Sequence, residues 1–287
     1  MKKILLFGGT GMAGNIIALY LKERGHDLVI FSRKKLDGFN CIIGDVTNTK
    51  LVEDSLKNQF DFVINCVGIL NEQCDKDTSL AIYVNSYFPH QLSRLCEMNN
   101  SKLIHISTDC VFSGEKGNYL ENSLRDGLSM YDRSKALGEL DNKRDLTFRQ
   151  SIIGPDTNVN GIGLFNWFMK QEGQISGYSK AIWTGVTTLT LAKAIEYAFT
   201  NDIVGIYHLV NNDRISKYSL LGLFNKHFRK NDLNIVEDSR LAMDKSLINS
   251  RNDFDFIVPS YEQMVIEMKD WILKHLELYP HYNDNVK

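Results

Sequence analysis

Residues 3–14 read KILLFGGTGMAG, a short apolar run that ends in glycines and leads directly into a helical pattern. The run predicts a buried strand, and Gly8, Gly11 and Gly14 form the spacing G-x-x-G-x-x-G. Glycine at such positions permits a tight turn, a close approach of backbone to a pyrophosphate and close packing of helix on sheet. The helix start adds unpaired N–H groups and a dipole that favours phosphate. We therefore expect a dinucleotide to contact Gly8, Thr10, Gly11, Met12 and Gly14.

The rest of the N-terminal half alternates strand-like and helix-like segments. Further strands are predicted at 27–31, 39–43, 60–68, 102–107 and 145–152, and helices at 12–24, 48–58, 78–99 and 131–140. Pro89 is expected to kink or break the third of these helices. The alternation predicts an α/β fold in which residues 1–155 form a Rossmann-type, doubly wound parallel sheet with right-handed crossovers.

The second half, residues 156–287, is less regular. It predicts a helix near 187–200, a strand at 205–210 and a terminal helix at 260–277 that starts at Ser260. We expect mainly a smaller, discontinuous substrate-binding lobe, with some segments returning to the Rossmann domain. The charged tail after Tyr279 is expected to be frayed.

Polar or small residues follow several of the predicted strands, where ligands of parallel sheets bind. Ser32 and Arg33 offer a hydroxyl and a cation to the 2′-phosphate of NADP, the alternative being a solvated basic turn. Asp45 is placed to accept from an adenine amino group, or else to cap the next helix. The sequence therefore predicts NADPH, with NADH as the alternative, bound also by Ser32, Arg33, Asp45, Val46, Cys66, Val67, Gly68, Tyr131 and Lys135, of which Lys135 could reach the nicotinamide ribose.

Composition excludes several other classes of protein. The formal net charge of −2 gives no basic field for nucleic acid or an anionic membrane. The N-terminal apolar run is too short for a signal peptide, and no stretch approaches the roughly 20 apolar residues of a membrane span. The five scattered cysteines predict reduced thiols in a cytoplasmic protein, and the histidines lack the spacing of metal ligands. We expect no metal site, no nucleic-acid partner and no membrane partner.

Tyr131 and Lys135 form a Y-x-x-x-K motif on a predicted helix, so that the two side chains share one face. A nearby ammonium is expected to lower the pKa of the phenol, which can then exchange a proton with a carbonyl or alcohol oxygen. Thr108, at the end of a predicted strand, can donate to the same oxygen. The alternative is a purely structural pair on a helix.

The chain resembles extended short-chain dehydrogenase/reductases that act on nucleotide sugars, and within them the dTDP-4-dehydrorhamnose reductase branch. The resemblance lies in Ile106–Gly114 (ISTDCVFSG), Tyr119–Glu121 (YLE) and Tyr131–Glu139 (YDRSKALGE), and covers residues 1–155 best. It implies that Thr108, Tyr131 and Lys135 are catalytic. It also implies that Asp109, Val111, Phe112, Lys180 and Trp183 lie on the substrate side. Lys180 would meet a diphosphate, while Trp183 would stack on a base or sugar, or belong to the core.

The resemblance implies an NAD(P)H-dependent reductase of the 4-keto group of an NDP-6-deoxy-4-keto-hexose, used in deoxysugar biosynthesis for a surface polysaccharide. Cys110 stands where dehydratases of the class carry glutamate, which disfavours a dehydratase. The basic turn at Ser32 and Arg33 counts mildly against an epimerase with tightly bound NAD. A third alternative is a non-catalytic regulatory subunit that keeps the dinucleotide-binding fold. Relatives often form homodimers through the helix that carries Y-x-x-x-K, and the pattern leaves this open here.

Overall fold

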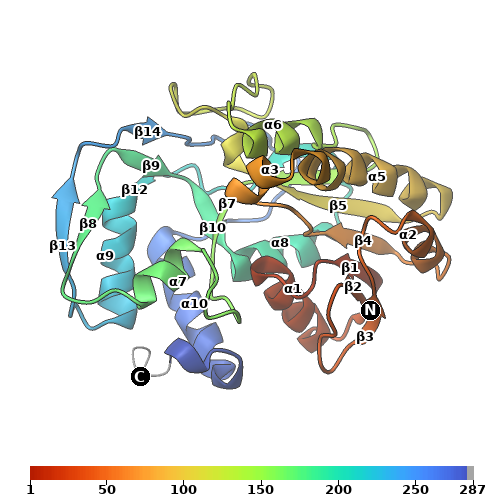
Figure 1. Ribbon diagram of the computed structural model, residues 1–287, viewed down its shortest axis with the longest axis horizontal. Coiled ribbons are helices and arrows are strands. Elements are labelled where there is room, and N and C mark those ends of the chain that lie inside the picture. Colours follow the sequence, from red (N-terminus) through yellow and green to blue (C-terminus); the bar gives the residue numbers. More distant parts are fainter. Residues whose placement is uncertain (283–287) are drawn as a thin grey trace.

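The computed structural model, which describes residues 1–282, is built around one seven-stranded parallel sheet (Figure 1). The strand order is β11-β6-β5-β4-β1-β2-β3, and the reversal of strand order lies between β1 and β4. This arrangement confirms the predicted Rossmann-type fold. The strands are β1 (Lys3–Phe7), β2 (Asp27–Ser32), β3 (Asn40–Ile43), β4 (Phe62–Asn65), β5 (Lys102–Ser107), β6 (Leu146–Arg149) and β11 (Gly205–His208).

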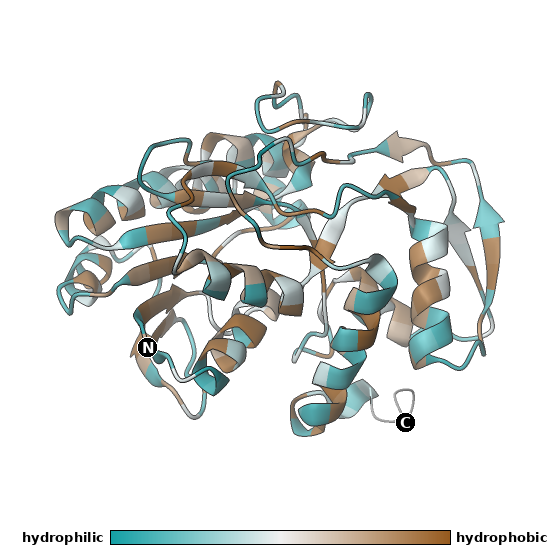
Figure 2. Ribbon diagram, turned by 180° about the vertical axis from the view of Figure 1, so that it is seen from behind, coloured by the Kyte–Doolittle hydropathy of each residue, from teal (hydrophilic) through white to brown (hydrophobic). Residues whose placement is uncertain are grey.

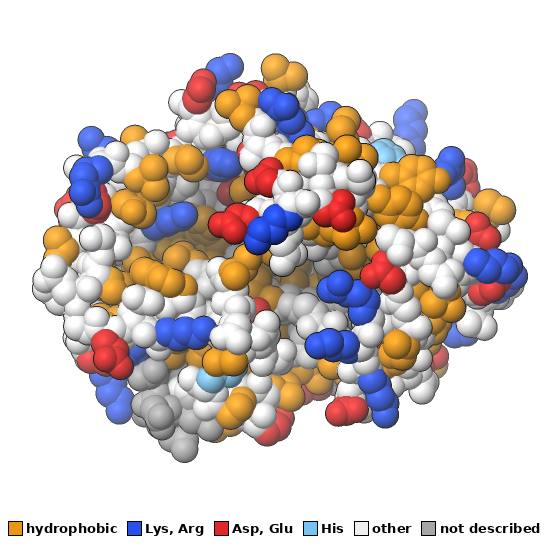
Figure 3. Space-filling view, in the orientation of Figure 1, with side chains coloured by type: hydrophobic (Ala, Val, Ile, Leu, Met, Phe, Trp, Pro, Cys, Tyr) orange, Lys and Arg blue, Asp and Glu red, His pale blue; other side chains and the backbone are white. Residues whose placement is uncertain are grey.

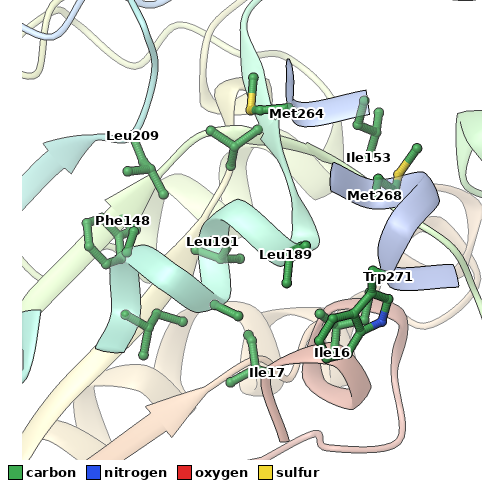
Figure 4. Packing of buried hydrophobic residues seen from close by; sticks show 14 of the residues in the cluster. Ile16, Ile17, Phe148, Ile153, Leu189, Leu191, Leu209, Met264, Met268 and Trp271 are labelled. Atoms are coloured by element: carbon green, nitrogen blue, oxygen red, sulfur yellow. The ribbon is translucent and has the colours of Figure 1, made fainter. Parts of the chain in front are cut away.

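Alternate residues of the central strands supply two separate cores, one on each face of the sheet. Ile4 and Leu6 of β1 face α1 (Met12–Glu23) and α8 (Thr188–Ala198), whose packing is shown in Figure 4. Leu5 and Phe7 belong to the core under α2 (Thr49–Leu56) and α5 (Phe88–Met98). Figure 2 shows the hydrophobic strands between helices whose outer surfaces are hydrophilic. Strands that are buried on both faces explain the nearly continuous apolar runs of the sequence.

The predicted helix at 78–99 is interrupted just before Pro89 by a π-helical segment. The chain runs through α4 (Thr78–Ala81), a π-helical segment η1 (Ile82–Tyr87) and then α5, in whose first turn Pro89 lies. A proline in the first turn of a helix removes an N–H that would have no intrahelical partner. The π segment therefore lets the helix restart at the proline.

The strands predicted at 145–152 and 60–68 are each shorter than expected. Gln150 separates β6 from β7 (Ser151–Ile153), which leaves the main sheet and pairs with β10 (Gly185–Thr187). Of the strand predicted at 60–68, only Phe62–Asn65 forms a strand. The residues after Asn65 form a loop, which is the part of the segment that reaches the site described below.

The second lobe consists of small sheets and three helices, and the segment with α8 and β11 returns to the Rossmann domain. Ser260 caps α10 through a bond from the Gln263 N–H, as the sequence predicts. Tyr282 is buried, so the tail is ordered at least to that residue, which corrects the expectation of fraying after Tyr279. Residues 283–287 lie outside the described residues. The elements of this lobe are α7 (Leu164–Met169), β8 (Gln174–Tyr178), β9 (Ala181–Trp183), β12 (Ile215–Ser216), α9 (Lys217–Phe228), β13 (Asn234–Asp238), β14 (Met243–Asp244) and α10 (Tyr261–Lys274).

Among residues 1–282, no helix has both the length and the apolar character that crossing a bilayer requires.

Candidate active site

A cavity of about 520 Å³ opens at the carboxyl ends of β1, β2, β3 and β4, beside the switch point of the sheet. Its volume is in the range of small-molecule sites. In Figure 3 the face of the molecule is hollowed near its centre, with hydrophobic side chains inside and charged ones at the rim. The predicted cofactor residues that line the cavity are Gly8, Thr10, Gly11, Ser32, Arg33, Asp45, Val46, Cys66, Val67 and Gly68.

The glycine loop has the geometry that a dinucleotide requires. Gly8 has a φ of +85°, a conformation that residues with a side chain rarely adopt. A Cβ on Gly14 would lie 2.1 Å from the Gly8 carbonyl oxygen, so only glycine lets α1 pack this closely on the loop. Gly11 caps α1 without a side-chain hydrogen bond, which leaves N–H groups of the first turn open to a phosphate. These residues therefore fit a bound pyrophosphate.

Two of the predicted loop contacts are absent from the cavity wall. Gly14 supports the loop through packing. The Met12 sulfur faces the second lobe, where it would lie 3.2 Å from a Cβ on Gly163. Neither residue lines the cavity, and their contact with a bound dinucleotide stays a prediction.

Asp45 lies on the cavity wall and does not cap the next helix. Its Oδ1 accepts hydrogen bonds from the Thr47 N–H at 3.0 Å and the Thr47 hydroxyl at 2.8 Å. The bond from the Thr47 N–H lowers the pKa of Asp45, and the Arg33 guanidinium contributes in the same direction. The cap of α2 is Asn48, which accepts from the Leu51 N–H. Asp45 is thus an ionised acceptor beside a cation at the rim.

The helix with the Y-x-x-x-K motif, α6 (Met130–Leu137), is fixed at its start and along its length. Ser129 and Asp132 form a reciprocal capping box, which gives a structural reason for aspartate after Tyr131. Asn85 of η1 donates to the Ser134 hydroxyl at 3.0 Å and accepts from the Ile69 N–H at 2.9 Å. The π segment therefore ties α6 to the loop after β4, a role that was not predicted from the sequence.

Lys135 is buried, 5% exposed, and its Nζ donates to the Ile106 carbonyl oxygen at 2.7 Å. Burial lowers the pKa of Lys135 to about 8, while Glu139 and Cys66 act in the opposite direction. Its charge in turn influences Cys66, a residue of the cavity wall. The ammonium group therefore stands directly behind the cavity.

Tyr131 is partly exposed, and its hydroxyl lies near that of Thr108. Burial raises the pKa of Tyr131, and a hydrogen bond with Thr108 only partly opposes that rise. The prediction that Lys135 lowers this pKa is wrong, because the ammonium bonds to the backbone of β5 instead. Tyr131 is therefore protonated near neutral pH.

A buried charge network lies under the end of β5, where Ser107 and Thr108 are located. Glu139, just after α6, accepts from the Ser107 hydroxyl at 2.6 Å and from the Arg149 Nε at 2.7 Å. Although burial raises the pKa of Glu139, the bonds from Arg149 hold it below its usual range. Arg149 also contacts His208 Nε2 at 2.8 Å. The network fixes Ser107 beside Thr108, so Thr108 is the hydroxyl that remains near Tyr131.

The predicted substrate residues divide into buried and accessible ones. Asp109 is 6% exposed and accepts from the Thr108 hydroxyl at 3.2 Å. Val111 and Phe112 are fully buried, and Phe112 stacks on Tyr119 under the Arg149 guanidinium. Their side chains support the site from within the core, which corrects their prediction as substrate contacts.

Trp183 and Lys180 lie apart from the catalytic residues. Trp183 is 5% exposed and packs against Tyr261 in the main core, so its ring is not free to stack on a ligand. The core alternative was therefore the correct one. Lys180 is exposed and lines a separate shallow groove together with Asp244 and Ser113.

Within residues 1–282, no cluster of three or more His, Cys, Asp or Glu side chains has the arrangement of a metal site.

The fold and the site together define a dinucleotide-binding protein of the short-chain dehydrogenase/reductase type. The chain belongs to the RmlD substrate binding domain family, which matches residues 1–239. This membership confirms the resemblance found in the sequence.

Known relatives include reductases and a regulatory subunit. A probable low-salt glycan biosynthesis reductase from Haloferax volcanii is 33% identical over 137 residues, which cover 46% of this chain and 46% of that protein. The chain thus matches about half the length of this relative. Methionine adenosyltransferase 2 subunit beta from Danio rerio is 23% identical over 229 residues, covering 78% of this chain and 68% of that protein. The crystal structure of dTDP-4-dehydrorhamnose reductase from Bacillus anthracis in complex with NADP has a TM-score of 0.78 at 22% identity, covering 93% of this chain and 98% of that one.

Proposed function

We propose that the protein is an NADPH-dependent reductase of the 4-keto group of an NDP-6-deoxy-4-keto-hexose, in the biosynthesis of an activated deoxysugar for surface polysaccharide. One observation carries the proposal. The Thr108 and Tyr131 hydroxyls lie near each other, and the buried Lys135 ammonium lies near Cys66 in the wall of a cavity whose glycine loop leaves helix N–H groups open. The family membership and the reductases among the relatives support it.

The side chains present suit reduction of a carbonyl. A bound nicotinamide dinucleotide supplies the hydride. Tyr131, protonated because burial raises its pKa, donates its phenolic proton to the oxygen that becomes the hydroxyl. Thr108 positions that oxygen through its hydroxyl. Lys135 places a positive charge behind the cavity wall, near Cys66, where it favours negative charge on the bound ligand.

The preference for NADPH rests on the turn after β2. Arg33 lines the cavity and is exposed, and its guanidinium suits bidentate contact with a 2′-phosphate. NAD-specific sites of this fold usually carry an acid that binds the ribose hydroxyls at this position.

The test is the oxidation of NADPH and NADH in the presence of dTDP- and UDP-linked 4-keto-6-deoxy-hexoses. We expect rapid oxidation with one of these sugars and a preference for NADPH. Measurable binding of NADPH without oxidation in the presence of any of the sugars would contradict the proposal.

A second candidate function is that of a dinucleotide-binding regulatory subunit. The match to methionine adenosyltransferase 2 subunit beta extends over 78% of the chain, further than the match to the glycan biosynthesis reductase. The buried Lys135 behind the Thr108–Tyr131 pair favours catalysis instead. An enzyme that co-purifies with the protein, together with no turnover of any keto sugar, would favour the regulatory function.

We further infer that the protein works in the reducing cytoplasm. All five cysteines are free thiols, as expected where disulfides do not persist. A homodimer through α6 stays a prediction, which sedimentation equilibrium of the purified protein would test.

A further inference from the structure

One buried side chain at the carboxyl edge of the sheet has no polar partner in the part of the chain that the structure describes. Gln150 lies between β6 and β7 and is 1% exposed. Neither its amide nitrogen nor its amide oxygen forms a hydrogen bond with any of residues 1–282. A buried amide without partners destabilises a folded protein, so such a group calls for a reason, such as a role in binding. Gln150 is therefore a candidate for a residue whose partner is a ligand.

Gln150 is level with Thr108 on the neighbouring strand. Ser107 of β5 and Arg149 of β6 are paired in register, so the next residues along the two chains are Thr108 and Gln150. Neighbouring strands of a sheet lie about 4.8 Å apart. The Thr108 hydroxyl lies near that of Tyr131. Gln150 is therefore one strand away from the hydroxyls that would act on a carbonyl.

The order of the strands indicates which half of a dinucleotide points toward Gln150. The cavity has Arg33 and Asp45, which suit the adenosine half, at the ends of β2 and β3, and the glycine loop that fits the pyrophosphate follows β1. In a sheet of this type a dinucleotide lies across the switch point. The nicotinamide half is therefore directed past β4 toward β5 and β6, the strands that end at Thr108 and Gln150.

We propose that Gln150 binds the carboxamide of the nicotinamide ring. A carboxamide has an acceptor oxygen and an NH₂ donor, and the glutamine amide offers the same two groups, so that two hydrogen bonds can form in opposite directions. These bonds supply partners for both atoms that lack one within the chain, and they hold the ring in one orientation beside Thr108 and Tyr131. The amide is covered by its neighbours, so its side-chain torsions must change for it to reach the ring.

The inference deepens the proposed function, on which it rests for the use of a nicotinamide cofactor, and it does not depend on which sugar is reduced. Calorimetry with NADPH and with adenosine 2′,5′-bisphosphate, which has no nicotinamide, tests it without turnover. We expect Gln150→Met, which keeps the length of the side chain and removes its amide, to weaken NADPH binding about tenfold. The affinity for adenosine 2′,5′-bisphosphate should stay unchanged. Equal NADPH affinity in wild type and variant would overturn the proposal, as would an equal loss for both ligands.

The melting temperature, measured without added nucleotide, is a second readout that a merely structural glutamine would move in the opposite direction. Removal of an unsatisfied buried amide should raise the melting temperature of Gln150→Met by about 2–4 °C. A lower melting temperature in both Gln150→Met and Gln150→Leu would mean that the amide has partners inside the folded protein, and would overturn the proposal.

The matched control is Asn225→Leu on α9. Asn225 is buried like Gln150, but its amide donates to the Leu233 carbonyl oxygen at 2.8 Å and accepts from the Leu233 N–H at 3.3 Å. This variant should therefore melt at a lower temperature than the wild type and keep its affinity for NADPH.

The inference and the proposed function can fail separately. Weaker NADPH binding in Gln150→Met, together with no reduction of any keto sugar by the wild type, would refute the proposed function and leave the role of Gln150 standing. Reduction of a keto sugar by the wild type, together with unchanged NADPH affinity in Gln150→Met, would refute the role of Gln150 alone.

Discussion

At the scale of single residues, the proposed function makes Tyr131 the proton donor. Its raised pKa and its contact with Thr108 suit the direction of reduction. We expect Tyr131→Phe to lower kcat by about 10²- to 10⁴-fold, the usual contribution of a positioned acid. The ring should keep its packing, so the Kd for NADPH, measured by fluorescence titration, should change little. Near-normal turnover in this variant would refute the role of Tyr131.

Lys135 gives a second prediction, for the pH dependence of the reaction. Burial lowers the pKa of Lys135 to about 8, so its ammonium is present below that pH and lost above it. We expect kcat/KM to fall about tenfold per pH unit above pH 8. Lys135→Arg keeps its charge across this range and should remove the fall, although its activity will be lower. An identical alkaline fall in Lys135→Arg would show that another group titrates.

At the scale of an element, α1 packs so closely on the glycine loop that a side chain at Gly14 would clash with the loop backbone. A Cβ on Gly14 would lie 2.1 Å from the Gly8 carbonyl oxygen. We expect Gly14→Ala to displace α1, to weaken NADPH binding at least tenfold and to destabilise the protein by about 1–3 kcal/mol, as overpacking does. Calorimetry and urea unfolding measure the two effects.

The control for this variant is Gly222→Ala, within α9, where an added Cβ meets nothing within 4 Å. Alanine in an open helical position should stabilise the protein by about 0.5–1 kcal/mol. Similar effects of the two substitutions would mean that the loop tolerates a side chain and that its glycines are not needed for packing.

The same elements show what the sequence could predict. The loop at Gly8 and the Tyr131–Lys135 pair are local signals, because spacing along one strand or helix decides which residues meet. The π segment before Pro89 was missed, because apolar periodicity hardly differs between α and π turns. The π segment places Asn85 so that it donates a hydrogen bond to Ser134, and these two residues are 49 positions apart in the sequence.

At the scale of the whole molecule, the Rossmann domain was predictable and the second lobe largely was not. Carboxyl ends of parallel strands must meet at one edge, so residues after different strands could be assigned to one cavity. The environment of Trp183 depends on Tyr261, and that of Asp109 on Lys217 and Lys245. Such interactions join residues that are more than 70 positions apart and carry no periodic signal.

The final prediction concerns stability of the whole fold in acid. Burial lowers the pKa of His105 well below its usual value, and burial together with the Arg149 guanidinium lowers that of His208. Both rings stay neutral in the folded protein, whereas the unfolded chain takes up their protons as the pH falls below about 6.5. Because the unfolded state then binds more protons, the free energy of unfolding must decrease as the pH falls.

We expect each histidine to lower the free energy of unfolding by about 1.4 kcal/mol per pH unit below pH 6.5. Urea unfolding at several pH values from about 7.5 to about 5 measures this slope. The range includes the histidine pKa of the unfolded chain, about 6.5. His105→Asn keeps a polar group beside Asn65, the partner of His105 Nδ1 at 3.2 Å, but has no proton to gain. The slope of the free energy of unfolding against pH should be smaller in this variant by the contribution of one histidine, about 1.4 kcal/mol per pH unit. A slope equal to that of the wild type would mean that His105 does not contribute to it, and would contradict a lowered pKa for this ring in the folded protein.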